Sequence, residues 1–400
     1  MNEKNLLLRL FSAGPRAALA GIADTQWSGI LELAGKQHVA AYLYDHLQET
    51  GTLGMIPEDA KEALFQAFQA NTFRNMALIA EFRRITEAFS KQEIPVIGLK
   101  GLHLAEKIYP HIGLRYLRDL DVLVPAEQME SAYRATLALG YQCEKVITKQ
   151  DLVAPHHHHL HQQYHPDKAI ILELHGYLIE DKNIEMRELW ENASPFEGHH
   201  YRYLDSEDLL LHLCMHISYS DLFKIDLRHY LDIYMMLKNQ SEKINWEAFL
   251  VRAEKRGLTK GVLLVMQITS ELFACKLPEQ LQRIVKDDPG QRERINHAVD
   301  FMWQYDKSSK GYNAYKSRVF VPDEPILRRL VKRIFIPKEE LSFYYSLDPD
   351  SWRVYPYYGR RVYDLFQRHF FMLIRTRTDS RQIEAVDKTR ILHRYLFGDW

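Results

Sequence analysis

The chain has 400 residues, of which 46% are hydrophobic and 26% charged, and its formal net charge is -1 at pH 7. This length allows two or three domains with a substantial core, while the near-zero charge excludes a general attraction to nucleic acid or anionic membranes. The three scattered cysteines are too few for a disulfide framework or a cysteine zinc site. No apolar run reaches the roughly 18 residues of a membrane span, and the N-terminus has no cleavage-site pattern. We therefore expect a cytoplasmic protein with no membrane partner.

Residues 1–92 are predicted to form an N-terminal helical region. Apolar residues recur at helical spacing up to Gly51 and Gly54, which stop the pattern. A long helix is predicted to begin near Pro57, because proline is favoured in a first helical turn and acidic residues follow it. One face of this helix is apolar. We interpret that stripe as a packing layer behind a sheet, with a lid over a nucleotide as the alternative; it comprises Leu78, Phe82, Ile85 and Phe89.

Residues 93–204 alternate between strand and helix patterns. A short apolar run ends at Gly98 and reads as a first buried strand. Gly140 follows a predicted helix in the usual C-terminal position. The expected strands cover residues 94–97, 119–124, 141–147 and 169–175, and the expected helices cover residues 102–109 and 125–139.

Two aspartates stand at the head of the second predicted strand. Side chains alternate faces along a strand, so Asp119 and Asp121 point the same way while Leu120 and Val122 point into the core. Two adjacent carboxylates raise each other's pKa unless a cation lies between them. Magnesium suits such a pair, because it takes one or two carboxylates and completes its shell with water and substrate phosphates.

A third carboxylate occurs on the last predicted strand of this region. Glu173 and His175 share one face of the apolar run 169–175. A single acid inside such a run is unfavourable unless it is paired or bound to metal. We interpret Glu173 as the third metal-binding acid, with an ion pair to Arg115 or Arg118 as the structural alternative.

Taken together, these motifs resemble the uncharacterised bacterial nucleotidyltransferases of the DNA polymerase beta-like superfamily. The similarity extends from about Trp27 to the last hundred residues. Lys100 stands where the superfamily usually has serine, and the spacer to the acid pair is longer. The elements that carry the resemblance are Leu99-Lys100-Gly101, Arg115, Asp119-Leu120-Asp121 and Glu173-Leu174-His175.

This resemblance implies an α+β fold with a small mixed β-sheet. The nucleotidyltransferase core would occupy residues 93–204, between helical regions at residues 1–92 and 205–400. The implied activity is transfer of a nucleoside monophosphate from an NTP to an acceptor hydroxyl with release of pyrophosphate. The acceptor, whether a small molecule, a protein or RNA, and the oligomeric state stay open. A non-catalytic nucleotide sensor or an interaction protein on the same fold is the alternative.

The resemblance and the residue types also indicate roles within the site. Mg²⁺ or Mn²⁺ would be held by Asp119, Asp121 and Glu173, which are also the expected catalytic residues. Glycine lets the backbone approach phosphate, lysine supplies a point charge, and arginine can clamp phosphate with two hydrogen bonds. The residues expected to contact the phosphates are Lys100, Gly101, Arg115 and Arg118.

Two histidine patterns allow metal binding as well. The loop Pro155–His161 is rich in histidine and could bind zinc or cobalt, but we interpret it as a polar loop beside the active site, in which one histidine could contact phosphate. His212 and His216 lie four apart on a predicted helix, a spacing that can bind zinc. No glutamate stands at the metalloprotease position, so we interpret them as core histidines or as supports of the site.

Residues 205–400 are predicted to be largely helical. Arg228 and Asp232 fall on one helix face and are expected to pair with each other or to reach the substrate. Farther along, basic residues interleave with aromatic ones, a mixture that can bind a nucleic-acid acceptor. The overall charge favours a solvated helix face beside a tyrosine-rich packing cluster. The basic run comprises Arg328, Arg329, Lys332 and Arg333.

Overall fold

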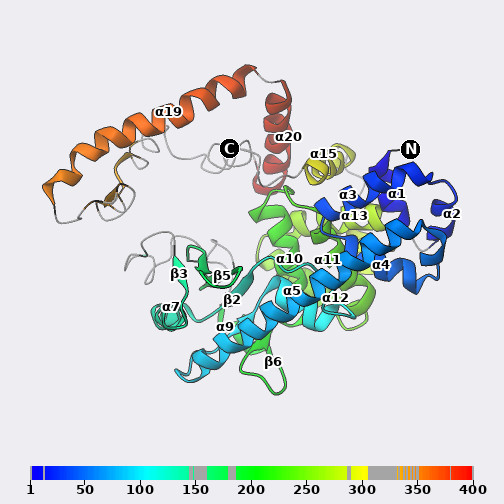
Figure 1. The fold of residues 1–400 in the computed structure, drawn as a ribbon, viewed down its shortest axis with the longest axis horizontal. Coiled ribbons are helices and arrows are strands. Elements are labelled where there is room, and N and C mark those ends of the chain that lie inside the picture. The colour runs from blue at the N-terminus through cyan, green and yellow to red at the C-terminus, as the bar shows by residue number, and fades with distance from the viewer. Residues whose placement is uncertain are drawn as a thin grey trace. The chain divides into compact units, whose positions relative to one another are not determined.

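The structure is a computed structural model. It describes residues 2–11, 14–143, 147, 160–178, 186–285 and 290–304 and, in the C-terminal part, residues 331, 334–336, 338, 341–342, 345, 347, 351–378 and 380–398. The chain divides into two compact units, Met1–Gln142 with Lys149–Trp303 and Cys143–Thr148 with Gln304–Trp400. Figure 1 shows the elements of both units in chain order.

The predicted α+β fold is confirmed, because the described residues form a mixed sheet flanked by helices. The sheet has seven strands in the order β3-β4-β5-β2-β1-β7-β6. At its centre β2 runs antiparallel to β1 and parallel to β5. The strands are β1 (Ile97–Gly98), β2 (Leu120–Leu123), β3 (Gln142–Cys143), β4 (Gln163–His165), β5 (Ile170–His175), β6 (Ser194–Pro195) and β7 (Arg202–Tyr203).

Central strands match the predicted ones, whereas edge strands do not. β2 and β5 lie within the predicted runs, and every residue of β2 is buried. The first strand is shorter than expected and excludes Pro95, which has no backbone N–H to donate to a sheet. The short strands β4, β6 and β7 escaped the sequence analysis because runs of two or three residues carry no periodicity.

The N-terminal part is helical, as predicted, and its last helix is long. α5 has 33 residues and contacts α3 and α4 as well as α7 (Met129–Ala138), which follows the second strand (Figure 1). All four residues of its predicted apolar stripe are buried, so the interpretation as a packing layer is confirmed. These helices are α1 (Glu3–Leu10), α2 (Pro15–Leu19), α3 (Trp27–Lys36), α4 (Ala40–Glu49) and α5 (Glu58–Ser90).

A second group of helices follows the sheet and packs on it. α10 contacts α11, α12 and α13, and it also contacts α6 (Lys100–His103), the helix directly after β1. Because α13 also contacts α1, the first unit joins helices from both flanks to the sheet, and the predicted division at residues 92 and 204 stays a prediction. The remaining helices of this unit are α9 (Met186–Asn192), α10 (Ser206–Met215), α11 (Leu227–Gln240), α12 (Trp246–Lys255), α13 (Thr259–Phe273), α14 (Glu279–Ile284) and α15 (Gln291–Gln304).

In the second unit, α19 (Pro356–Thr378) contacts α20 (Ser380–Phe397) and the short 3-10 helix η6 (Trp352–Val354). Tyr345 donates a hydrogen bond to Asp364 at 2.8 Å, but Trp352 and Tyr355 are 74% and 65% exposed, so the predicted tyrosine-rich packing cluster stays a prediction. The basic run at 328–333 lies outside the described residues, so its proposed nucleic-acid role stays untested. None of the described helices combines the length and the apolar character that a membrane crossing requires.

Candidate functional site

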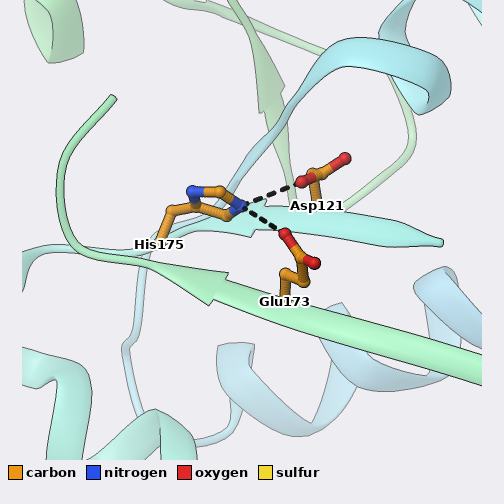
Figure 2. A group of neighbouring side chains, drawn as sticks. All are labelled: Asp121, Glu173 and His175. Carbon is orange, nitrogen blue, oxygen red and sulfur yellow. Dashed lines mark hydrogen bonds and ion pairs between the residues drawn. The ribbon is translucent and has the colours of Figure 1, made fainter. Parts of the chain in front are cut away.

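Parallel pairing of β2 and β5 places two acids side by side. In the register of these strands Asp121 stands opposite Glu173, and Leu123 stands opposite His175. Since neighbouring residues in register point to the same face, the two carboxylates meet above one side of the sheet. One ligand atom from each of Asp121, Glu173 and His175 lies within 4.8 Å of the others, as Figure 2 shows. The two strand motifs therefore converge on one point.

The imidazole of His175 lies between these carboxylates. Its Nε2 atom is 2.9 Å from Asp121 Oδ1 and 3.6 Å from Glu173 Oε2 (Figure 2). Burial opposes protonation of the ring, but hydrogen bonds to Asp121 and Glu173 outweigh it and raise the pKa of His175. The histidine can therefore hold a proton that offsets part of the acid charge.

Lys100 supplies a second positive charge to the same acids. Its Nζ lies 2.8 Å from Asp121 Oδ1, and its side chain is only 16% exposed. Burial disfavours the ammonium form, but Asp121 and then Glu173 overcome this and raise the pKa of Lys100. Its backbone has φ of 44°, a left-handed conformation that is unfavourable for a residue with a Cβ, by on the order of 1 kcal/mol. The turn after β1 thus places the Lys100 ammonium beside Asp121, although its backbone conformation is unfavourable.

The ionisation of the paired acids follows from these neighbours. Burial raises the pKa of Asp121, but Lys100 and His175 reverse this and hold it well below its usual range. Burial also raises the pKa of Glu173. The hydrogen bond to His175 is the main effect that lowers it, and the resulting pKa is about 2. Gln162 donates a further hydrogen bond to Glu173. Both carboxylates are therefore charged at neutral pH.

Asp119 differs from the other two acids. It directly precedes β2, and no hydrogen bond or ion pair to its carboxylate is present among the described residues. Burial, followed by the charges of Asp121 and Glu173, raises the pKa of Asp119. The charges of both acids act on Asp119, but Asp119 does not belong to the group of Asp121, Glu173 and His175, whose ligand atoms lie within 4.8 Å of one another. The charges of Lys100 and Arg118 act in the opposite direction without cancelling the rise in its pKa, so Asp119 is the least compensated of the three acids.

This donor set fits a divalent cation. Two carboxylate oxygens and an imidazole nitrogen converge, and the adjacent Asp119 is uncompensated. Within the described part of the chain, no other three His, Cys, Asp or Glu side chains group this closely. Carboxylates suit Mg²⁺ and Mn²⁺, and the imidazole adds a ligand that Mn²⁺ or Zn²⁺ accepts more readily than Mg²⁺.

A few residues before Asp119, Arg115 is committed to another acid. Its Nε and Nη2 donate to the two oxygens of Asp232 at 3.1 and 2.7 Å, a bidentate pair. Tyr109 donates to Asp232 as well, at 2.9 Å. The side chains of Arg115 and Asp232 are 7% and 0% exposed. We call Arg115, Asp232 and Tyr109 the Arg115 network.

The loop that leads from this network to Asp119 is held by α5. Asn75 donates to the carbonyls of Ile112 and Arg115, and it accepts from the backbone of Leu117. Arg74 donates to the carbonyls of Leu117 and Arg118 at 2.7 and 3.1 Å. Side chains of one long helix therefore satisfy the backbone of this irregular segment. This contact fixes the approach to β2 and with it the position of Asp119.

The four residues predicted to contact phosphate are placed differently from one another. Only Lys100 touches the acids. A Cβ at Gly101 would come within 2.7 Å of Arg115 Nη1, so close packing on Arg115 explains the glycine. Arg115 itself is engaged by Asp232. The charge of Arg118 acts on Asp119. The phosphate roles stay predictions, and the geometry favours Lys100 and Arg118 over the other two.

Two features of the site were not predicted from the sequence. His175 was part of the motif but was given no role, although its position two residues after Glu173 on a strand was a usable signal. The expected pair of Arg228 with Asp232 is wrong, because Arg228 binds Asp226 and Asp232 binds Arg115. Helical spacing did not indicate either of these two ion pairs. The histidines at 156–159 lie outside the described residues.

Comparison with known proteins gives one finding. A family model described as uncharacterised nucleotidyltransferase matches residues 23–274, more than half of the chain. No match was found among curated proteins or among solved structures. The matched segment includes α3, the whole sheet and the helices up to α13. It therefore contains every residue of the site described above.

Proposed function

We propose a specific activity for this protein, which belongs to the uncharacterised nucleotidyltransferase family: it moves a nucleoside monophosphate from an NTP to an acceptor hydroxyl. The acceptor oxygen forms a bond to the α-phosphorus, the bond from that phosphorus to the β-phosphate oxygen breaks, and pyrophosphate leaves. The membership of the chain in a wider DNA polymerase beta-like superfamily and its bacterial origin are further proposals that rest on the motif alone.

The convergence of Asp121 and Glu173 beside the uncompensated Asp119 is the observation that carries this proposal. Three acids on adjacent strands repel one another, and a purely structural site would not retain them without matching cations. Lys100 and His175 offset part of this charge, yet Asp119 stays without a partner among the described residues. A cation-dependent substrate would complete the balance.

Asp119, Asp121 and Glu173 would hold Mg²⁺ or Mn²⁺, while the protonated His175 beside them would offset part of their charge. When bound, such an ion neutralises charge that develops on the phosphoryl oxygens and on pyrophosphate. Asn75 and Arg74 keep the preceding loop rigid, so the carboxylate of Asp119 is positioned before the substrate arrives.

Glu173 and His175 would manage the proton of the acceptor hydroxyl. Glu173 takes the proton at Oε2, which lies 3.6 Å from His175 Nε2. Since two carboxylates stabilise the protonated imidazole, His175 would keep its own proton and balance the negative charge of the acids while Glu173 takes up the hydroxyl proton. Lys100 would contact the phosphates with the donors of its ammonium group that Asp121 does not use. Arg118, whose charge acts on Asp119, would contact them as well.

A non-catalytic nucleotide sensor is the second candidate, and one observation favours it. Lys100 and His175 both bind Asp121 Oδ1, at 2.8 and 2.9 Å. This arrangement lets protein cations occupy an oxygen that a catalytic ion would use. A sensor would bind an NTP at the same place without releasing pyrophosphate.

The test measures pyrophosphate release from each of the four ribonucleoside triphosphates, with Mg²⁺ or Mn²⁺ and with cell extract as the source of acceptor. The wild type is expected to release pyrophosphate from at least one of them. Asp121→Asn is nearly isosteric and should lower the rate by on the order of 10²–10³ or more, because it removes charge needed in the transition state.

A matched control is Asp59→Asn, which removes an exposed acid at the start of α5 and should leave the rate unchanged. Urea unfolding of each variant checks that the fold is retained. Absence of pyrophosphate release by the wild type with all four nucleotides, together with cation-dependent nucleotide binding, would favour the sensor over the transferase.

A further inference from the structure

Three histidines form a row on two neighbouring helices, one of which packs against the helix that begins at Lys100. His212 lies in α10, His216 begins the π-helical turn His216–Ser220 that follows it, and His229 lies in α11. The ring centroids of His212 and His216 are 6.5 Å apart, and those of His216 and His229 are 6.1 Å apart. We call these three residues the histidine row.

His212 is buried without any hydrogen-bond partner. It is 2% exposed, and neither of its ring nitrogens has a partner among the described residues. A neutral imidazole has one N–H donor and one acceptor whichever tautomer it adopts, so both are left unsatisfied. Leaving a buried polar group unpaired is unfavourable by about 1–3 kcal/mol. A phenylalanine of similar shape would avoid this free-energy cost, so the histidine is not explained by packing alone.

The other two rings are each held by a carboxylate. His216 Nδ1 is 3.0 Å from Asp221 Oδ2, and His229 Nδ1 is 2.9 Å from Asp226 Oδ1. These contacts fix the ring orientation and leave Nε2 as the remaining polar atom, with no hydrogen bond among the described residues. The side chains of His216 and His229 are 25% and 18% exposed. The row therefore leads from the buried His212 toward solvent.

The buried end of the row adjoins the acid site. α10 packs against α6, which begins at Lys100. Burial and then the charge of Lys100 lower the pKa of His212 well below its usual value, and Asp121 and His175 also act on it. Lys100 acts on His216 as well. Lys100 is therefore close enough to act electrostatically on both the acids and the buried end of the histidine row.

The chemistry of the row suits an anion better than a second metal. No three metal-ligand side chains that include His212 or His216 come within 4.8 Å of one another in the described part of the chain. Imidazole N–H groups and the Lys100 ammonium are donors, and phosphate oxygens are strong acceptors. Among the described residues the ammonium makes one hydrogen bond, to Asp121, so it has donors left for a phosphate.

We propose that the histidine row and Lys100 form the subsite for the pyrophosphate portion of a bound nucleoside triphosphate. The α-phosphate would lie over the acids, and the β- and γ-phosphates would extend past Lys100 toward His212 and His216. This inference rests on the proposed function, because it extends the same substrate site. It assigns to His212 the hydrogen-bond partner that the protein does not supply.

The experiment titrates the full chain by calorimetry, in Mg²⁺, with inorganic tripolyphosphate, with each of the four NTPs and with the matching monophosphates. His212→Phe and His216→Gln are expected to lower the affinity for tripolyphosphate and for the NTP about tenfold or more, since each removes a hydrogen bond to a charged group. Monophosphate affinity should change little. His212→Phe should also raise the urea midpoint, because it removes two unpaired buried nitrogens.

His199→Gln is the control, because His199 is also partly exposed but contacts aromatic residues of the β6–β7 hairpin. His216→Gln keeps the test decisive if His212→Phe fails to fold. Unchanged tripolyphosphate affinity in both variants, with pyrophosphate release intact in the wild type, would overturn the subsite and leave the proposed function standing. Loss of a bound divalent ion from His216→Gln, at unchanged tripolyphosphate affinity, would overturn it in favour of a metal site. Absence of both NTP binding and pyrophosphate release would overturn both proposals.

Discussion

Two buried polar clusters adjoin the same short loop, and they differ in how completely the protein satisfies them. In the Arg115 network, the guanidinium and carboxylate meet in a bidentate pair, and Tyr109 adds a third hydrogen bond. In the acid cluster of Asp119, Asp121 and Glu173, two protein cations share one aspartate oxygen while another aspartate has no partner among the described residues.

This difference separates a structural role from a functional one. A buried charge pair whose donors and acceptors are matched can hold a fold together without a ligand. A buried cluster with surplus like charge destabilises the folded state until something binds it, and such local conflicts are typical of functional sites. The stability of the folded state should therefore depend on loss of charge, on ligand and on pH in opposite ways in the two clusters.

The largest effect is expected from Asp232→Asn in the Arg115 network. This change leaves the buried guanidinium of Arg115 without its counter-ion, and breaking a buried pair in this way usually lowers stability by about 3–5 kcal/mol. Urea unfolding followed by circular dichroism would measure the loss. Activity should fall with stability, because the same network supports the loop before Asp119.

The paired replacement Arg115→Met with Asp232→Leu provides the control. Removing both charges leaves no uncompensated ion, so the double variant should recover most of the stability that the single change loses. If Asp232→Asn alone shifts the free energy of unfolding by less than about 1 kcal/mol, the network is not the structural element described here.

The acid cluster should respond to ligand, whereas the Arg115 network should not. Because crowded carboxylates repel a bare triphosphate, NTP binding should require a divalent ion. At a hundred times its Kd such a ligand raises the free energy of unfolding by about 2.7 kcal/mol. Thermal unfolding with Mg²⁺ and NTP, together and separately, measures this. Equal NTP affinity in EDTA would contradict the metal bridge.

A third comparison uses Glu81 on α5, whose carboxylate is matched like that of Asp232. Lys168 and Tyr141 donate to it at 2.6 and 3.1 Å, and Arg84 also pairs with it. Burial opposes its ionisation, but the bonds from Arg84 and Lys168 prevail and lower its pKa from 4.5 to about 2. The stability it contributes is therefore present above about pH 4.5 and is lost as the pH falls toward 2.

Glu81→Gln should lower the urea midpoint at pH 7 and flatten its decline between pH 4.5 and 2, the window set by the two pKa values. Unfolding measured across this range for both proteins checks the slope. An equally steep decline in the variant would mean that other carboxylates produce the acid sensitivity.

Much of the fold could be predicted from sequence because its signals are local. The stripe on α5 and the acids in apolar runs follow from helix and strand periodicity, and all four stripe residues are buried. The shared face of Asp121 and Glu173 followed from strand parity and was completed by their pairing in register. The convergence of these two acids on one face of the sheet was therefore predictable, whereas the binding of a metal there stays a prediction.

Features that depend on distant partners could not be predicted. Arg115 and Asp232 are 117 positions apart, and helical spacing instead suggested Arg228 as the partner of Asp232. His175 forms a hydrogen bond with Asp121 because β5 pairs in parallel with β2. Likewise, the lack of partners at His212 depends on packing around α10, which no local pattern encodes.

The smallest effect, and the most discriminating in sign, is expected from Asp119→Asn. Burial and the charges of Asp121 and Glu173 raise the pKa of Asp119 above its usual 3.8. Such a group favours the folded state when protonated, so stability is lost as the pH rises through and above that value. Asparagine keeps the shape and removes the repelled charge.

In EDTA at pH 7, Asp119→Asn should therefore raise the urea midpoint, whereas Glu81→Gln lowers it. With saturating Mg²⁺ and NTP the advantage should disappear, because the wild-type carboxylate then gains the cation that it lacks. Urea unfolding of both variants in both buffers measures the two signs. If Asp119→Asn lowers the urea midpoint in EDTA, the carboxylate already has a stabilising partner in the protein. The acid cluster would then not differ from the Arg115 network in carrying an uncompensated charge.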